Sequence, residues 1–214
     1  MFDRKKKEII EYGKKIFHSD HVAGTSGNLS CRGENGANTY FLITPSGMQY
    51  DALIPDDIVI MDLSGNKIEG KRRPSIEYSM HSNIYKSRNE VNAVIHTHSI
   101  YTSALAVARI PLPVIVEDLC LIGDEIKVAP YARAGSQQLA NNVVNTLGKA
   151  RAVILANHGL VSVGKDLKDA FKVCEMVERV ARIFILAKSI GKAYVLSSRE
   201  LEDLRDFLKS DYGQ

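Results

Sequence analysis

His96 and His98 lie at the end of an apolar segment, 93–97, that has the composition of a buried β-strand. Alternate side chains of a strand project to the same face, so the two imidazoles should point in the same direction. Two imidazoles on one face are a ready pair of metal ligands. Taken alone the pattern is weak, because histidines that bind no ligand show the same spacing.

A third histidine, His158, follows a second apolar segment, 151–156, and is itself followed by Gly159, where we expect a loop to begin. If both strands end at the same place, three imidazoles meet there. Three protein ligands with an open fourth position are typical of a catalytic zinc site rather than a structural one. We therefore predict a metal site formed by His96, His98 and His158.

Glu77 follows Pro74 and Ser75, and we expect Ser75 to be the N-cap of a helix that ends near residue 87. A carboxylate in the first turn is favoured by the helix dipole and could serve only to stabilise the helix. The alternative is a general base beside the metal, because forming an enolate requires a base and a Lewis acid at one carbon atom. His81, one turn later on the same face, is expected in the core; direct or indirect contact with the metal is the alternative.

Three segments rich in small and hydroxyl-bearing residues could bind a phosphate group: 24–28, 44–47 and Ser75 at the expected helix start. They offer hydroxyls and backbone N–H groups, and a helix N-terminus favours anions. Each segment alone is more often a simple turn. The chain has neither a P-loop nor a Gly-x-Gly-x-x-Gly motif after a strand, so we do not expect a nucleotide cofactor.

The elements that must position these residues alternate without the strict strand–helix–strand order of a parallel doubly wound sheet. We expect helices at 3–18, 75–87, 99–108, 135–148, 166–189 and 198–209, and strands at 29–32, 40–44, 57–62, 67–70, 93–97, 113–117, 126–129 and 151–156. The predicted fold is a single α/β/α layered domain, residues 1–214, with a mixed and mostly antiparallel central sheet.

The composition restricts the class of protein. A chain of 214 residues with 45% hydrophobic and 25% charged residues can bury a large core without a disulfide or a structural metal, so a metal would be functional. A net charge of +3 does not indicate a nucleic-acid partner. Three scattered cysteines, no signal peptide and no apolar run of about 20 residues predict a cytoplasmic protein without a membrane partner.

Five short motifs, in this order, resemble those of the class II aldolase/adducin family, and within it those of the fuculose-phosphate aldolases. They are Gly-Thr-Ser-Gly-Asn-Leu-Ser at 24–30, Ile-Thr-Pro-Ser-Gly-Met at 43–48, Pro-Ser-Ile-Glu at 74–77, Ile-His-Thr-His at 95–98 and Asn-His-Gly-Leu at 157–160. The gaps between the motifs are also similar, and the resemblance extends over nearly the whole chain. The combination is more specific for the family than for any one substrate.

The resemblance implies a set of site residues. It implies one Zn²⁺, or another divalent metal, per subunit on His96, His98 and His158, with Glu77 as acid/base and possible fourth ligand. It also implies a homotetramer with active sites between neighbouring subunits. The phosphate pocket it implies consists of Asn28, Ser46, Gly47 and Ser75.

Three positions outside these motifs, or differing within them, bear on the chemistry. Ile76 stands where the family usually has a second hydroxyl residue, and Glu117 stands where it usually has a tyrosine. Tyr212 matches the other tyrosine that the family uses, near the C-terminus, and is the second catalytic candidate beside Glu77. A phenol there would be a proton donor or a contact on the aldehyde side.

The resemblance implies reversible cleavage of a ketose 1-phosphate, such as L-fuculose 1-phosphate, to dihydroxyacetone phosphate and an aldehyde such as lactaldehyde. Two other reactions on the same site stay open: dehydration of methylthioribulose 1-phosphate and 4-epimerisation of L-ribulose 5-phosphate. Relatives with the epimerase activity usually carry aspartate at the place of Glu77. A non-catalytic interaction module like the adducin head is the third alternative, and such a module is expected to lack the metal ligands.

Overall fold

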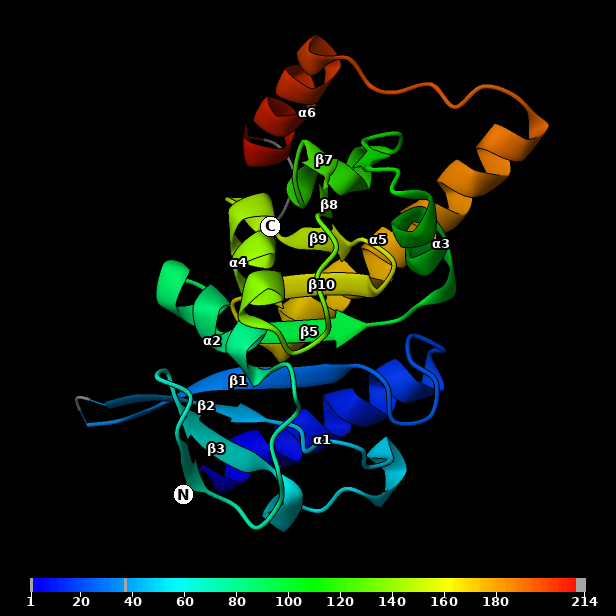
Figure 1. Cartoon of the computed structure of the whole chain (residues 1–214). Helices are drawn as coiled ribbons and strands as arrows, with labels where there is room; N and C mark the ends of the chain where they lie inside the picture. Colours follow the sequence, from blue (N-terminus) through cyan, green and yellow to red (C-terminus); the bar gives the residue numbers. More distant parts are fainter. Residues whose placement is uncertain (1, 37, 211–214) are drawn as a thin grey trace.

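An eight-stranded sheet forms the centre of the computed structural model, which describes residues 2–36 and 38–210. The strand order is β4-β3-β2-β1-β5-β10-β9-β8, and every neighbouring pair is antiparallel except β8 and β9 (Figure 1). The strands are β1 (Asn28–Asn35), β2 (Asn38–Ile43), β3 (Val59–Asp62), β4 (Lys67–Glu69), β5 (Ala93–Thr97), β8 (Val128–Ala129), β9 (Ala152–Leu155) and β10 (Gly159–Gly164). This confirms the prediction of a mixed, mostly antiparallel sheet.

Helices cover both faces of the sheet. α2 and α4 pack together on one face, and α1, α3 and α5 cover the other, as Figure 1 shows. Their bounds are α1 (Asp3–His18), α2 (Tyr78–Ser87), α3 (Ile100–Ala108), α4 (Gln137–Leu147), α5 (Leu167–Ile190) and α6 (Ser198–Ser210). The predicted α/β/α layering is therefore confirmed.

Side-chain alternation in the middle strands explains how one sheet serves two cores. In β5, Val94 packs with the α2 and α4 side, whereas Ala93 and Ile95 pack with the α1 side. By the same alternation, even-numbered residues of β1 face α2, while Leu29 and Cys31 face α1. Asn28 and the histidine of β5 thus belong to the face that α2 covers.

Two sequence expectations about strands are wrong. The strand expected at 113–117 is reduced to β6 (Leu112–Pro113), which pairs with β7 (Glu125–Ile126), and Glu117 begins the short helix η3 (Glu117–Leu121). Pro111 and Pro113 supply no N–H donors, so the segment cannot sustain a longer ladder. The strand expected at 126–129 is likewise divided between β7 and β8.

The expected loop after His158 is also wrong, because strand β10 starts at Gly159. β10 lies between β5 and β9, and all of its residues are buried. A strand covered on both faces loses the apolar–polar alternation that marks a strand in sequence, and glycines at both of its ends resemble turn signals.

Among the residues that the structure describes, no helix is both long and apolar enough to span a lipid bilayer.

Gly159 allows the close approach of β10 to β5. A Cβ atom there would lie 2.2 Å from the carbonyl oxygen of Thr97, a backbone atom of the paired strand. We expect Gly159→Ala to lower the free energy of unfolding by roughly 1–3 kcal/mol through overpacking. Urea unfolding with a chelator present, so that metal content makes no difference, measures the effect.

The control for this prediction is Gly191→Ala after α5, where an added Cβ meets no atom within 4 Å. This variant should keep the wild-type free energy of unfolding. Equal stability of the two variants would contradict the tight approach of the two strands.

Candidate metal centre

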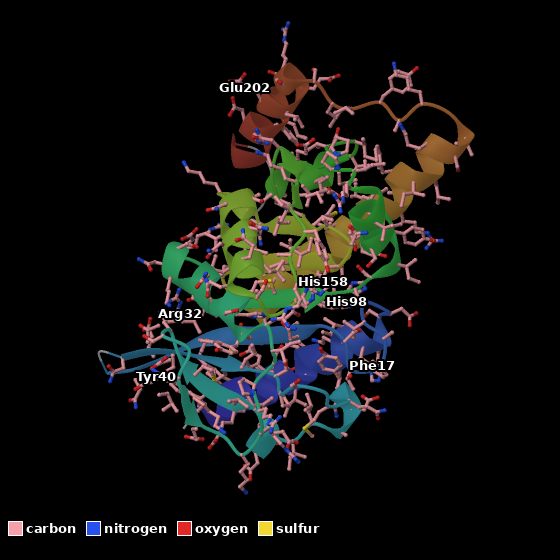
Figure 2. The ribbon with its side chains drawn as sticks, viewed as in Figure 1. Phe17, Arg32, Tyr40, His98, His158 and Glu202 are labelled. Carbon is pink, nitrogen blue, oxygen red and sulfur yellow. The ribbon has the colours of Figure 1, made fainter. Side chains whose placement is uncertain are left out.

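Three elements bring the predicted histidines together. His96 lies within β5, opposite Asn28 of β1 on one side and Val161 of β10 on the other. His98 follows the end of β5, and His158 lies in the turn that joins β9 to β10. The ligand atoms of the three imidazoles all lie within 4.8 Å of one another. Figure 2 shows His98 and His158 side by side above β1.

The spacing of the imidazole nitrogens fits a metal ion. Nε2 of His96 lies 3.0 Å from Nε2 of His98 and 3.3 Å from Nε2 of His158. Ligand nitrogens around a tetrahedral zinc ion with bonds of about 2.0–2.1 Å lie about 3.3 Å apart. Nδ1 of His96 lies 2.9 Å from the carbonyl oxygen of Leu160, to which it can only donate. That bond leaves the Nε2 lone pair directed to the centre.

The surroundings of His98 and His158 keep both imidazoles neutral, the form that binds a metal. Burial, with a further contribution from His96, lowers the pKa of His98 to about 4 and that of His158 to about 4. A metal binds the neutral imidazole, so neither ligand has to lose a proton near neutral pH. The neutral rings of His98 and His158 can therefore offer nitrogen lone pairs at the site, an arrangement that a bound cation would stabilise.

The turn that carries His158 has a constrained backbone. Asn157 adopts φ 55°, in the left-handed region that asparagine tolerates better than most residues. Its backbone N–H donates to the carbonyl oxygen of Ala106 at the end of α3, and its Oδ1 accepts from Arg109. The turn is thereby attached to α3, which determines where His158 points.

Glu77 lies beside the three histidines, but not as a first-turn helical residue. Its Oε2 is 3.2 Å from Nε2 of His96, and its Oε1 is 3.7 Å from Nε2 of His158. Burial alone would raise the pKa of Glu77, but His96, His158 and a hydrogen bond from Asn28 outweigh burial and bring it below its ordinary value. The carboxylate is therefore ionised, and Oε1 has no hydrogen-bond partner among the described residues.

The expected N-cap role of Ser75 is wrong, because Glu77 is the N-cap residue and α2 begins at Tyr78. Ser75 donates its backbone N–H to the carbonyl oxygen of Thr44, beside a β-bridge between Pro45 and Pro74. This pairing holds the backbone before Glu77 against the end of β2, so the helix starts later. As a result the carboxylate turns toward the histidines instead of lying along the helix.

A cavity of about 290 Å³ joins the metal site to the predicted phosphate segments. It is lined by Thr25, Ser26, Gly27, Asn28, Pro45, Ser46, Gly47, Ser75, Ile76, Glu77, His98, Ala134 and His158. The structure thus brings Asn28, Ser46, Gly47 and Ser75 to one cavity with Glu77 and two of the histidines. His96 is fully buried beneath it.

Some site features differ from the sequence expectations or lie beyond them. Ala134, in the loop before α4, lines the cavity although its residue type carries no functional signal. Ile76 lines the cavity as well. Glu117 is not among the described residues that line this cavity. Tyr212 lies outside the described residues.

Replacing His158 with Ala removes one of three converging nitrogens without removing core volume, since His158 lies at the cavity surface. We expect purified His158→Ala protein to lose its bound metal and to keep a wild-type circular-dichroism spectrum. Atomic absorption of protein dialysed against trace metal measures the content. The control is His18→Ala, which removes an exposed histidine of α1 and should retain metal. Full metal content in His158→Ala would contradict the site.

Comparison with known proteins gives a consistent result. The family model described as "Class II Aldolase and Adducin N-terminal domain" matches residues 7–185. The chain is 38% identical over 214 residues to 5-deoxy-D-ribulose 1-phosphate aldolase of Bacillus thuringiensis serovar kurstaki, covering 100% of this chain and 99% of the relative. It is 37% identical over 178 residues to L-fuculose phosphate aldolase of Haemophilus influenzae, covering 83% and 80%.

Solved structures agree with the sequence relatives. A structure described as L-fuculose 1-phosphate aldolase superposes with a TM-score of 0.92 at 39% identity, covering 96% of both chains. A further sequence relative, the 5-methylthioribulose-1-phosphate/5-deoxyribulose-1-phosphate aldolase of Rhodospirillum rubrum, is 35% identical over 206 residues, covering 96% of this chain and 90% of the relative. The chain therefore belongs to the class II aldolase and adducin N-terminal domain family, and it is an enzyme of the class II aldolase type.

Proposed function

We propose that the protein is a zinc-dependent aldolase that reversibly cleaves a ketose 1-phosphate into dihydroxyacetone phosphate and an aldehyde. One observation carries the proposal: three imidazole nitrogens and the Glu77 carboxylate converge at a cavity whose other wall is made of small polar residues. A Lewis acid, a base and an anion-binding wall are what cleavage of a phosphorylated ketose requires.

His96, His98 and His158 would hold the zinc ion, with Glu77 close enough to become a fourth ligand in the absence of substrate. When bound, Zn²⁺ supplies Lewis-acid chemistry, withdrawing electron density from the substrate carbonyl. The remaining steps belong to residues of the chain.

Glu77 has two carboxylate oxygens in different surroundings. Oε2 accepts a hydrogen bond of 2.9 Å from Nδ2 of Asn28, whereas Oε1 has no hydrogen-bond partner among the described residues. In the synthetic direction Oε1 would take a proton from the carbon beside the carbonyl of dihydroxyacetone phosphate. The electron pair left on that carbon then forms the bond to the aldehyde carbon, while the C=O π pair of the aldehyde moves to its oxygen, which takes up a proton from the proposed donor Tyr212. In cleavage that hydroxyl loses its proton, the carbon–carbon bond breaks, and the Glu77 carboxyl returns a proton to the carbon beside the carbonyl.

The phosphate would bind at the small polar wall formed by Asn28, Ser46, Gly47 and Ser75. Ser75 illustrates why this wall suits an anion. Its Oγ accepts a hydrogen bond from the backbone N–H of Glu77, so its own hydroxyl proton is available to donate. Small side chains also let the phosphate oxygens approach the backbone closely.

The substrate is proposed at the level of its class. The printed names of the relatives include fuculose phosphate, 5-deoxyribulose 1-phosphate and 5-methylthioribulose 1-phosphate. Aldol cleavage of each yields the same dihydroxyacetone phosphate and a different short aldehyde. L-Fuculose 1-phosphate, with lactaldehyde as the aldehyde, and 5-deoxy-D-ribulose 1-phosphate, with acetaldehyde, are the first two candidates.

We also propose that residues 1–214 form one domain and that the protein is a homotetramer with sites between subunits. Apolar side chains of α3 and α5 support a covered surface: Val107 is 65% exposed, Leu186 50% and Ile190 89%. Exposed large apolar residues on neighbouring elements are typical of protein–protein contacts. Tyr212 stays a proposed proton donor that a tetramer would bring to a neighbouring site.

The substrate assay separates the candidate reactions. Purified protein is incubated with L-fuculose 1-phosphate, 5-deoxy-D-ribulose 1-phosphate, 5-methylthioribulose 1-phosphate and L-ribulose 5-phosphate, with and without a chelator. We expect dihydroxyacetone phosphate from at least one of the first two, loss of activity with the chelator and recovery on adding Zn²⁺. Water loss from the methylthio sugar without dihydroxyacetone phosphate would indicate a dehydratase, and a C4 epimer of ribulose phosphate an epimerase.

Glu77→Gln tests the base. Because the amide cannot accept the proton, we expect solvent deuterium to enter dihydroxyacetone phosphate about 10²–10⁴-fold more slowly, a typical loss for a general base. Proton NMR measures this exchange, and metal analysis and phosphate binding should remain as in the wild type. The control is Glu11→Gln, an exposed carboxylate on α1. Wild-type exchange by Glu77→Gln would mean that another group removes the proton.

A further inference from the structure

A chain of buried hydrogen bonds leads from Glu77 into the core between β1 and α2. Nδ2 of Asn28 donates to Oε2 of Glu77 at 2.9 Å, and Oδ1 of Asn28 lies 2.5 Å from Nε2 of His81. Nδ1 of His81 lies 2.6 Å from Oγ of Ser30, which lies 2.7 Å from the hydroxyl of Tyr85. His81, Ser30 and Tyr85 are fully buried.

The fold places these residues by combining two periodicities. Asn28 and Ser30 are alternate residues of β1 and share the face that α2 covers. His81 and Tyr85 are one turn apart on α2 and share the helix face that packs on β1. Polar side chains of β1 and α2 thus contact one another inside a core that is otherwise apolar.

The donors in this chain can be assigned from one end. The Glu77 carboxylate only accepts, so Asn28 must present its Nδ2 to it and its Oδ1 to His81. Oδ1 also only accepts, so Nε2 of His81 carries the proton. In neutral imidazole Nδ1 then accepts from the Ser30 hydroxyl, and Ser30 accepts from Tyr85.

Burial lowers the pKa of His81 to about 3, so the ring is neutral at working pH. A neutral ring with one protonated nitrogen matches the direction of hydrogen bonds just derived. With His81 in the opposite tautomer, two lone pairs would face each other at 2.5 Å.

We infer that His81 is a positioning residue for Glu77: its Nε2–H holds the Asn28 amide in the orientation that donates to Oε2. Oε1, which has no hydrogen-bond partner among the described residues, is thereby left as the oxygen available to take the proton. Without the Nε2–H, the amide can turn over and present Oδ1 to the carboxylate, which would displace Glu77. The structural arrangement stands by itself, and its effect on proton transfer rests on the proposed function.

The tautomer can be tested without any activity measurement. In protein labelled with ¹⁵N at histidine, the His81 signals are identified by their absence from the His81→Gln spectrum. We expect a protonated Nε2 and an unprotonated Nδ1, unchanged between pH 6 and pH 9. A proton on Nδ1, or a signal that titrates in this range, would overturn the inference.

Paired variants test the effect on Glu77. His81→Met fills a similar volume without a donor, whereas His81→Gln can extend an N–H toward Oδ1 of Asn28. We expect His81→Met to slow deuterium exchange into dihydroxyacetone phosphate by about 10- to 100-fold, the usual cost of losing such a supporting partner. KM and metal content should change little, and His81→Gln should recover most of the rate.

The matched control is His21→Met, a second buried histidine, whose ring packs against Phe171. It should cost stability without slowing exchange. Equal loss of rate in His81→Met and His81→Gln at wild-type metal content, or a wild-type rate in His81→Met, would overturn the inference. Failure of the proposed function shows differently, as a wild-type protein that catalyses no exchange while the His81 tautomer is as stated.

Discussion

The antiparallel pairing of β1, β5 and β10 is the constraint on which the site depends. The register places Asn28, His96 and Val161 side by side across three strands. A slip of one residue between β1 and β5 would turn either Asn28 or His96 to the opposite face. The apolar residues of the same strands, which alternate between two cores, prevent that slip. Burial of ordinary hydrophobic side chains therefore sets the geometry of the polar ones.

α2 and the segment before it supply Glu77 and His81, and they lie on the sheet face that carries Asn28 and His96. It begins at Tyr78 because the preceding segment is held against the end of β2, and that late start directs Glu77 to the histidines. Farther along the helix, His81 reaches back to Asn28 through the core. The carboxylate is thus held from two sides, by the backbone pairing before it and by side chains behind it.

Much of this arrangement could be predicted from the sequence, and there are physical reasons why the remaining features could not. Strongly patterned segments such as α1 and β5 are predictable from the sequence, and the structure brings His96, His98 and His158 together as expected. β10 was missed because a strand buried on both faces has no alternation to detect. The late start of α2 depends on pairing with a segment some thirty residues earlier in the chain. The position of Ala134 in the cavity wall depends on the conformation of the loop before α4. Neither is encoded in local residue patterns.

A metal ion held by His158, in the turn at Asn157, would have a thermodynamic consequence. His96 and His158 are 62 residues apart in sequence, so one ion held by both closes a long loop of the chain. A ligand that binds only the folded chain raises the unfolding free energy by RT ln(1 + [L]/Kd). The conformational stability of this enzyme is then a function of the free metal concentration around it. Cellular metal supply would set its folded fraction as well as its catalytic state.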